Sequence, residues 1–276
     1  MSTGTRWIGR VVVGALLVVP LAVALAGPWV AHLAPDSPQA PFSSSTWSPF
    51  GTDRLGRDVL AAVLEGGRPL VVTAGLTVAA AYLVGSVVGL AAATTRHAWV
   101  DDLLMRPVDV ALCFPSLLVV LVAALRSDGS GVAIAVAVGL TLVAPIARFV
   151  RMAARDVVQG PAMDALRLQG AGLLDRYARH AAGRLARPVA ADLGVRLTAA
   201  IYVLASANFI GIGFDTTSPD WAVSVAANKD GLSLAPWSVA LPALLIVALV
   251  LGLNLLGDAV LGGPDRLRWT RTARRG

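Results

Sequence analysis

The chain has 276 residues, of which 56% are hydrophobic with glycine left out and only 14% are charged. An average soluble domain is about 25% charged, so this composition excludes an ordinary water-soluble fold and the disordered, fibrous and disulfide-stapled classes. It indicates an integral membrane protein. The only lysine among the 23 basic residues, Lys229, is followed by Asp230. A phosphate-binding loop of the GxxxxGK[ST] kind is therefore excluded. The net charge of +6 fits basic cytoplasmic loops better than nucleic-acid binding.

Residues that could carry chemistry are few. The one cysteine, Cys113, excludes an internal disulfide, and His32, His97 and His180 lie far apart at span ends or in loops. We therefore expect no catalytic residue, no metal centre and no cofactor bound by this chain. A secondary carrier would favour two related halves with ionisable sites near mid-membrane, and neither is evident.

Six stretches are long and apolar enough to cross a bilayer, which takes about 20 residues. They are residues 11–33, 70–94, 103–125, 132–150, 193–214 and 238–261. The fold class we expect is an all-α integral membrane protein with six transmembrane helices. The connections leave no room for a separate soluble catalytic domain.

The basic residues predict the orientation. If both termini are cytoplasmic, the inner segments carry 17 basic residues and the outer loops carry 5. We therefore expect an N-in, C-in topology. Arg6 and Arg10 before an apolar run would also suit a secretory signal, but the run to Leu33 is longer than a signal core, so we expect the span to be retained. Cleavage would leave the other five spans oriented as before.

The outer loop, residues 34–69, contains an amphipathic pattern over 52–68. Its apolar residues recur at helical spacing, with charged residues on the other side. The pattern predicts one helix, with Thr52 or Asp53 as candidate caps. Such a helix would either lie flat on the membrane or form part of an outer docking face.

The inner loop, residues 150–191, is the most basic part of the chain. Pro161 is suited to open a helix that runs to about Gln169, and residues 170–172 (Gly-Ala-Gly) would break it before a second amphipathic helix. Such an elbow would either rest on anionic lipid headgroups or dock a cytoplasmic partner. The residues alone leave these two alternatives open.

At this loop the sequence resembles the permease subunits of bacterial ABC importers. Their cytoplasmic signature, an acid–Ala pair followed by a Gly and then a His, has counterparts in Asp164, Ala165, Gly170 and His180, with Asp164 in place of the usual Glu. Other stretches resemble, in order, the dipeptide/oligopeptide/nickel class and its DppC/OppC-like members. They are residues 51–58, 101–109, 114–117, 147–151, 208–213, 219–221 and 254–258. The resemblance extends over residues 51–266.

The resemblance implies an ABC type I importer permease fold with a cytoplasmic coupling helix, located in the bacterial plasma (inner) membrane. The chain would form half of a pathway for dipeptides or oligopeptides that an extracytoplasmic binding protein delivers. A DppB/OppB-like subunit would complete the pathway, and DppD/DppF-like ATPase subunits would bind ATP and Mg²⁺. Cargo of nickel chelates, haem or another small solute is the alternative, and a secondary transporter is a more distant one.

The resemblance also implies roles for particular residues. The residues implied in ATPase coupling are Asp164, Ala165, Gly170, Ala171 and His180. Those implied in binding-protein docking are Asp53, Arg57 and Asp58. Asn208 would line the pathway or bridge two helices. Asp164 would pair with the ATPase or cap its own helix, and Gly170 would permit a close bend or simply end the helix.

The expected organisation has three parts. Residues 1–69 hold the first span and the outer loop, residues 70–265 form the five-helix permease domain, and residues 266–276 form a basic tail. Within the spans, Gly85 and Gly89 form a GxxxG pattern suited to close helix packing. Asp109 and Asp192 lie within about two turns of an expected span end, where they would anchor an interface.

Overall fold

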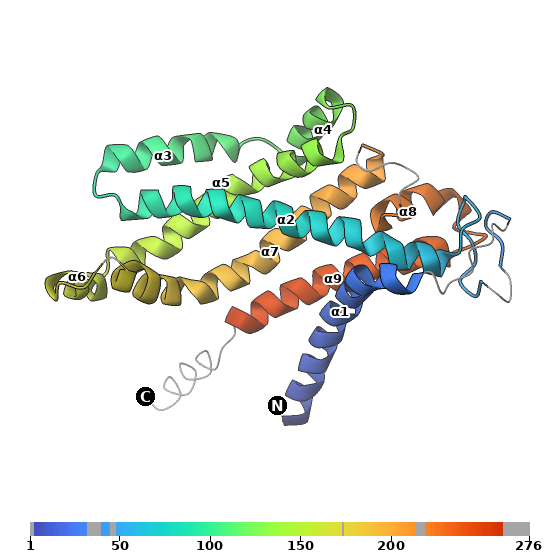
Figure 1. Cartoon of the computed structure of the whole chain (residues 1–276), viewed down its shortest axis with the longest axis horizontal. Coiled ribbons are helices and arrows are strands. Elements are labelled where there is room, and N and C mark those ends of the chain that lie inside the picture. The colour runs from blue at the N-terminus through green and yellow to red at the C-terminus, as the bar shows by residue number, and fades with distance from the viewer. Residues whose placement is uncertain (1–2, 32–39, 45–47, 173, 213–218, 262–276) are drawn as a thin grey trace, which may run out of the picture. The chain divides into compact units, whose positions relative to one another are not determined.

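All regular structure in the described part of the chain is helical. The computed structural model describes residues 3–31, 40–44, 48–172, 174–212 and 219–261 (Figure 1). The helices are α1 (Thr3–Val30), α2 (Val59–Thr94), α3 (Ala98–Ala111), α4 (Ser116–Arg126), α5 (Gly131–Val158), α6 (Pro161–Leu168), the π-helical η2 (Leu174–Ala181), α7 (Ala182–Ile210), α8 (Trp221–Asn228), the 3₁₀ turn η3 (Lys229–Gly231) and α9 (Trp237–Leu261). The expected tail, 266–276, and the expected span ends at Leu33 and Phe214 lie outside the described residues.

Within the described residues, five helices are long and apolar enough to cross a membrane. The stretches are Val11–Val30, Val59–Thr94, Gly131–Val158, Ala182–Ile210 and Trp237–Val260. A sixth span exists only if α3 and α4 are counted together as a bent pair. The multi-pass, all-helical fold is confirmed, but the continuous span expected over 103–125 is wrong at its centre. Pro115, which is extended at φ −61° and ψ 123°, has no N–H to continue a helix and disfavours helical geometry at Phe114.

The chain divides into two compact units. The first comprises Met1–Thr77, Pro115–Gly139 and Leu197–Leu253, and the second comprises Val78–Phe114, Leu140–Arg196 and Asn254–Gly276. The boundaries fall within α2, α5, α7 and α9, so each unit contains part of each of these helices. Below, the two are called the first unit and the second unit.

In the first unit, α2 begins later than the expected amphipathic helix and continues into the next span without interruption. Its cap is Asp58, whose Oδ1 accepts the backbone N–H of Ala61 at 3.1 Å, and not Thr52 or Asp53. The fully buried Trp221 of α8 donates its indole N–H to the Val63 carbonyl at 2.8 Å. This packed segment contradicts the alternative of a separate helix lying flat on the membrane.

Two adjacent glycines allow close packing around this part of α2. A β-carbon on Gly66 would lie 1.7 Å from the Pro219 carbonyl oxygen, and one on Gly67 would lie 2.4 Å from the Trp221 ring. The same added β-carbon on Gly67 would also lie 2.6 Å from the Cα of Ala24 in α1. Only glycine leaves room for these backbone approaches.

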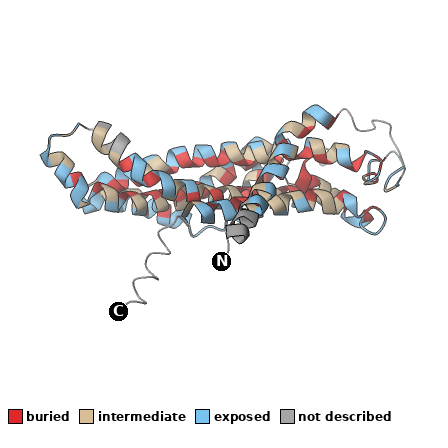
Figure 2. Ribbon diagram, turned by 90° about the horizontal axis from the view of Figure 1, so that it is seen from below, coloured by how far each residue is buried: buried red, intermediate tan, exposed pale blue. Residues whose placement is uncertain are grey.

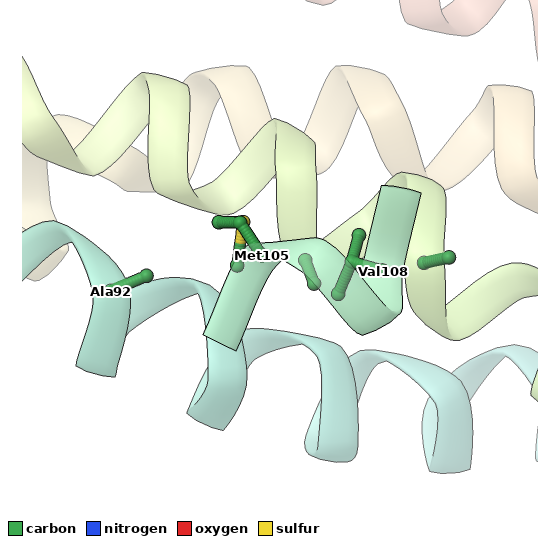
Figure 3. Packing of buried hydrophobic residues seen from close by; sticks show 5 residues of the cluster. Ala92, Met105 and Val108 are labelled. Atoms are coloured by element: carbon green, nitrogen blue, oxygen red, sulfur yellow. The ribbon is translucent and has the colours of Figure 1, made fainter. Parts of the chain in front are cut away.

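The second unit has a small apolar core between α2, α3 and α5. Figure 3 shows Met105 and Val108 of α3 pointing between the neighbouring helices, near Ala92 of α2. The GxxxG pattern serves this packing, because a β-carbon on Gly85 would lie 2.8 Å from Ile146 and one on Gly89 would lie 2.5 Å from the Ala147 carbonyl oxygen. The packing role expected for the pattern is confirmed.

In the same unit, α7 begins at Ala182, eleven residues before the expected start of the fifth span. Asp192 therefore lies about 15 Å into this helix. Its expected place near a helix end is wrong. A second cluster, in which Ala93, Val158 and Leu185 are buried, packs α7 against α2 and α5 and explains why the helix is ordered this far from the apolar run.

The outer faces of the long helices are apolar. Figure 2 shows exposed and buried residues alternating along the helices, and large exposed side chains include Leu83 at 72%, Val132 at 75% and Leu140 at 63%. Such faces suit lipid or a partner subunit, because in water they would form extended hydrophobic patches.

We predict that Gly66→Ala destabilises the protein by about 1–3 kcal/mol, because the added methyl group overlaps the backbone at Pro219. The measurement is thermal unfolding of the detergent-solubilised protein. The matched control is Gly75→Ala in the same helix, where a β-carbon meets nothing within 4 Å. Equal melting temperatures for the two variants would contradict the packing described for Gly66.

Candidate functional site

The expected elbow in the inner loop is a short helix, α6. Gly160 precedes it with extended geometry, and Pro161 occupies its first position, where the missing N–H costs nothing. The helix ends at Leu168, one residue before the expected end. Both ends of this element were therefore predicted closely from local sequence signals.

Gly170 ends α6 through its backbone conformation. Its φ is +70°, its N–H donates to Arg167 O at 3.1 Å, and the Ala171 N–H donates to Leu166 O at 3.0 Å. These two bonds form a Schellman motif, which favours glycine at the left-handed position. A β-carbon on Gly170 would meet nothing within 4 Å, so the expectation that this glycine permits a closely packed bend is wrong. The structure shows the other alternative, in which Gly170 ends the helix.

Asp164 is exposed and forms an ion pair with Arg167 of its own helix, with Nη1 and Oδ1 2.8 Å apart. It does not cap α6, because the residue at the cap position is Gly160 and no side chain bonds there. Ala165 and Gly170 are exposed, while Ala171 and His180 are partly buried. The roles of these five residues in coupling remain predictions.

Three contacts attach α6 to the helices of the second unit. Met163 is fully buried, and Arg167 Nη2 donates to the Val158 carbonyl at the end of α5, at 3.4 Å. At the junction, Gln159 Nε2 donates to the Ala93 carbonyl of α2 at 3.0 Å. The opposite side of α6 presents Leu168, which is 91% exposed.

Charged side chains join α3 to α5. Asp101 accepts two hydrogen bonds from the Arg151 guanidinium and has Arg155 Nη1 3.6 Å away. Further along both helices, Arg148 forms an ion pair with Asp109. The Asp101 and Arg151 side chains are 15% and 24% exposed, whereas both members of the Asp109–Arg148 pair are about half exposed.

A more buried network joins α7 to α2. Arg196 makes two hydrogen bonds to Asp192, at 2.9 and 3.0 Å, and Tyr82 donates its hydroxyl to the same carboxylate at 2.5 Å. The charges therefore neutralise each other within the unit. This arrangement suits a helix–helix link better than a proton carrier.

The segment before α2 forms a tight turn. Asp53 Oδ1 accepts the N–H groups of Leu55 and Arg57 at 2.8 and 2.9 Å, and Gly56 adopts a φ of +75°. Of the three expected docking residues, Arg57 is exposed, Asp53 shapes the turn, and Asp58 is 4% exposed because it caps α2. Asp58 is thus placed for a structural role.

Asn208 is 3% exposed and donates Nδ2 to Asp220 Oδ1 at 3.2 Å. The same oxygen accepts the N–H groups of Ala222 and Val223 and so caps α8. Asn208 was expected to line the pathway or to bridge two helices, and the structure shows it bridging α7 to the start of α8. Its role in the pathway remains a prediction. Burial raises the pKa of Asp220 to about 6, although the three donors oppose this shift.

Several of these partners could not be found from sequence. Tyr82 gave no signal, since it lies 110 residues from Asp192. The i, i+4 spacing of Asp192 and Arg196 could have indicated their pairing. No group of three His, Cys, Asp or Glu side chains in the described ranges could hold a metal ion.

These features define a class: a multi-pass helical membrane protein with a short exposed helix between two spans and paired charges between helices. Residues 85–265 match the family described as the binding-protein-dependent transport system inner membrane component. The chain belongs to this family. It is a permease component, and the ATPase of such transporters is a separate subunit.

Similar proteins come from several bacteria. The chain is 34% identical over 254 residues to a putative peptide transport system permease protein of Brucella suis, covering 89% of this chain and 83% of the relative. It is 30% identical over 266 residues to the glutathione transport system permease protein GsiD of Pectobacterium atrosepticum, covering 93% and 87%. It is 29% identical over 267 residues to the di/tripeptide transport system permease protein DppC of Pseudomonas aeruginosa, covering 91% and 86%.

We predict that Asp220→Asn stabilises the protein at pH 7–8 by roughly 1–3 kcal/mol, because the amide keeps an oxygen for the cap and removes a buried charge. The raised pKa means that wild-type stability falls as pH rises from about 4 to 6 and then levels off. The advantage of the variant should therefore vanish near pH 4. Melting temperatures of both proteins across this range test it, and a pH-independent difference would contradict it.

Proposed function

We propose that this chain is the permease subunit that forms half of the translocation pathway in an ATP-driven importer of short peptides. The observation that carries the proposal is the set of relatives above, which are named for peptide, glutathione and di/tripeptide transport and are matched over more than four fifths of their length. Glutathione is itself a tripeptide, so these names share one cargo chemistry. They favour peptides over nickel chelates or haem.

The proposed setting is the plasma membrane of a bacterium, with both termini in the cytoplasm. The family description and the excess of arginine in the inner segments support it. The proposed partners are a second homologous permease subunit, cytoplasmic ATPase subunits that bind ATP and Mg²⁺, and an extracytoplasmic binding protein. In this topology α6 lies in the cytoplasm and serves as the coupling helix.

The turn before α2 is the proposed docking element for the binding protein. Arg57 is its exposed charged member, and Asp53 fixes its shape through two backbone bonds. Arg54 is also exposed, and its N–H donates to the buried Asn228 side chain at 2.9 Å. The turn is therefore rigid enough to present charges at fixed positions.

Reconstitution tests the proposed function. We expect the chain, co-reconstituted in proteoliposomes with its second permease subunit and ATPases, to import a radiolabelled dipeptide when ATP is on the ATPase side and the binding protein is on the other. A control without ATP should show no uptake. Gradient-driven, ATP-independent uptake by this chain alone would overturn the proposal in favour of a secondary carrier.

We also predict that Leu168→Ser lowers ATP-dependent uptake by about tenfold or more, because a buried apolar contact in the ATPase cleft is lost. Uptake and co-purification of the ATPase subunits are the measurements. The matched control is Leu234→Ser, because Leu234 lies in the turn before α9 and its side chain is 70% exposed. If both variants transport like the wild type, Leu168 is not the coupling contact.

A further inference from the structure

The Asp109–Arg148 ion pair differs from the other helix-linking charges in its exposure. Its two side chains are 50% and 52% exposed, whereas Asp192 and Arg196 are 10% and 17% exposed. Each member therefore keeps hydrogen-bonding atoms turned away from its partner. The pair joins α3 to α5 yet remains open on one side.

We expect this pair to lie near the inner edge of the hydrocarbon layer, because Arg148 falls in the apolar run 132–150 that is expected to cross the membrane. The part of α5 that precedes Arg148 begins at Gly131 and is about 25 Å long, which is shorter than the roughly 30 Å thickness of the hydrocarbon core. Any tilt of the helix would bring Arg148 deeper. Asp109 is held at the same depth by the ion pair.

The backbone beside the pair is irregular and exposed at this depth. Helix α3 ends at Ala111, and residues 112–114 continue as an exposed turn. No backbone N–H among the described residues donates to the carbonyl groups of these three residues. Irregular backbone at membrane depth is tolerated where it is buried in protein or lines a water-filled cavity, and this turn is not buried within the unit.

Lipid is therefore a costly neighbour for this surface, whereas water or a protein partner could satisfy its polar groups. A half-exposed ion pair and open carbonyl groups in hydrocarbon would each cost several kcal/mol. Water satisfies all of these groups at once. The same helix carries an apolar hollow of about 560 Å³, lined by Leu103, Arg106, Pro107, Val110, Ala111 and Phe114.

We propose that Asp109, Arg148 and the turn 112–114 line the water-filled translocation pathway, and that the ion pair contacts the charged ends of the passing peptide. An unblocked peptide carries one ammonium and one carboxylate, which match the half-exposed carboxylate of Asp109 and the half-exposed guanidinium of Arg148. The apolar hollow on α3 would receive the side chains of the peptide, which vary in size. This inference rests on the proposed function.

The native cysteine reports whether the turn is in water. Cys113 is the chain's only cysteine and is exposed within the turn. In the reconstituted complex, we expect it to react with a membrane-impermeant, positively charged methanethiosulfonate at least about tenfold faster than a cysteine at position 83 in a Leu83→Cys/Cys113→Ala variant, since modification requires the hydrated thiolate. Mass spectrometry of this chain gives both rates. Equal, slow rates would overturn the pathway assignment.

A second experiment tests the contact with cargo. Asp109→Asn should lower the ATP-dependent uptake of a free dipeptide by about tenfold while changing the melting temperature by no more than about 2 °C, because exposed pairs contribute little to stability. Arg148→Gln should behave alike. The control Asp101→Asn removes the partner of Arg151 and Arg155 and should lower the melting temperature clearly.

The outcomes separate the two proposals. Dipeptide uptake that is unchanged in Asp109→Asn, or a melting temperature that falls in step with uptake, would overturn the pathway role and leave the importer function standing. A wild-type complex that imports no peptide would overturn the proposed function itself.

Discussion

A charge inside a membrane span or at its end must have an opposite charge or water beside it, and this requirement organises the second unit. Asp192, Arg196 and Tyr82 satisfy it by mutual contact between α7 and α2. Asp101 satisfies it with Arg151 and Arg155 between α3 and α5. Because breaking such a pair would leave a charge stranded in a low dielectric, these contacts restrict how the helices can slide past one another.

The difference in burial between the pairs fits two roles, holding helices together for the buried pairs and contacting cargo for the proposed pathway pair. A closed network such as that of Asp192 has few remaining hydrogen-bonding atoms, so it can hold helices but cannot exchange partners easily. The Asp109–Arg148 pair costs little to open, because water or cargo can replace either partner. A pathway surface needs this second property, since a solute has to bind weakly enough to leave.

Sequence reasoning succeeded where the signal was local. The ends of α6 follow from Pro161 and Gly170, and the close packing of Gly85 and Gly89 follows from their spacing and was confirmed. It failed where apolarity continues through a change in backbone direction. Hydropathy over 103–125 does not register that Pro115 stops one helix and starts another.

The start of α7 was missed for a related physical reason. Residues near its N-terminus include exposed arginines, which favoured a second amphipathic helix separate from the span, whereas the buried Leu185 belongs to the first turn of the spanning helix itself. The candidate site was predictable as a segment but not as a network. Asp101 and Arg151 are 50 residues apart, and Asp109 and Arg148 are 39 apart, so only the tertiary fold brings them together.

A continuous set of contacts leads from the exposed face of α6 into the second unit. Met163 and the Arg167–Val158 bond fix α6 to the end of α5, and Gln159 ties the same junction to α2. From there α5 is a single helix as far as Arg155, Arg151 and Arg148, which hold α3. A close-packed helix transmits displacement along its length because its interior cannot be compressed. In the proposed complex, a force applied by the ATPase at Leu168 would therefore reach the turn 112–114 through α5 and α3.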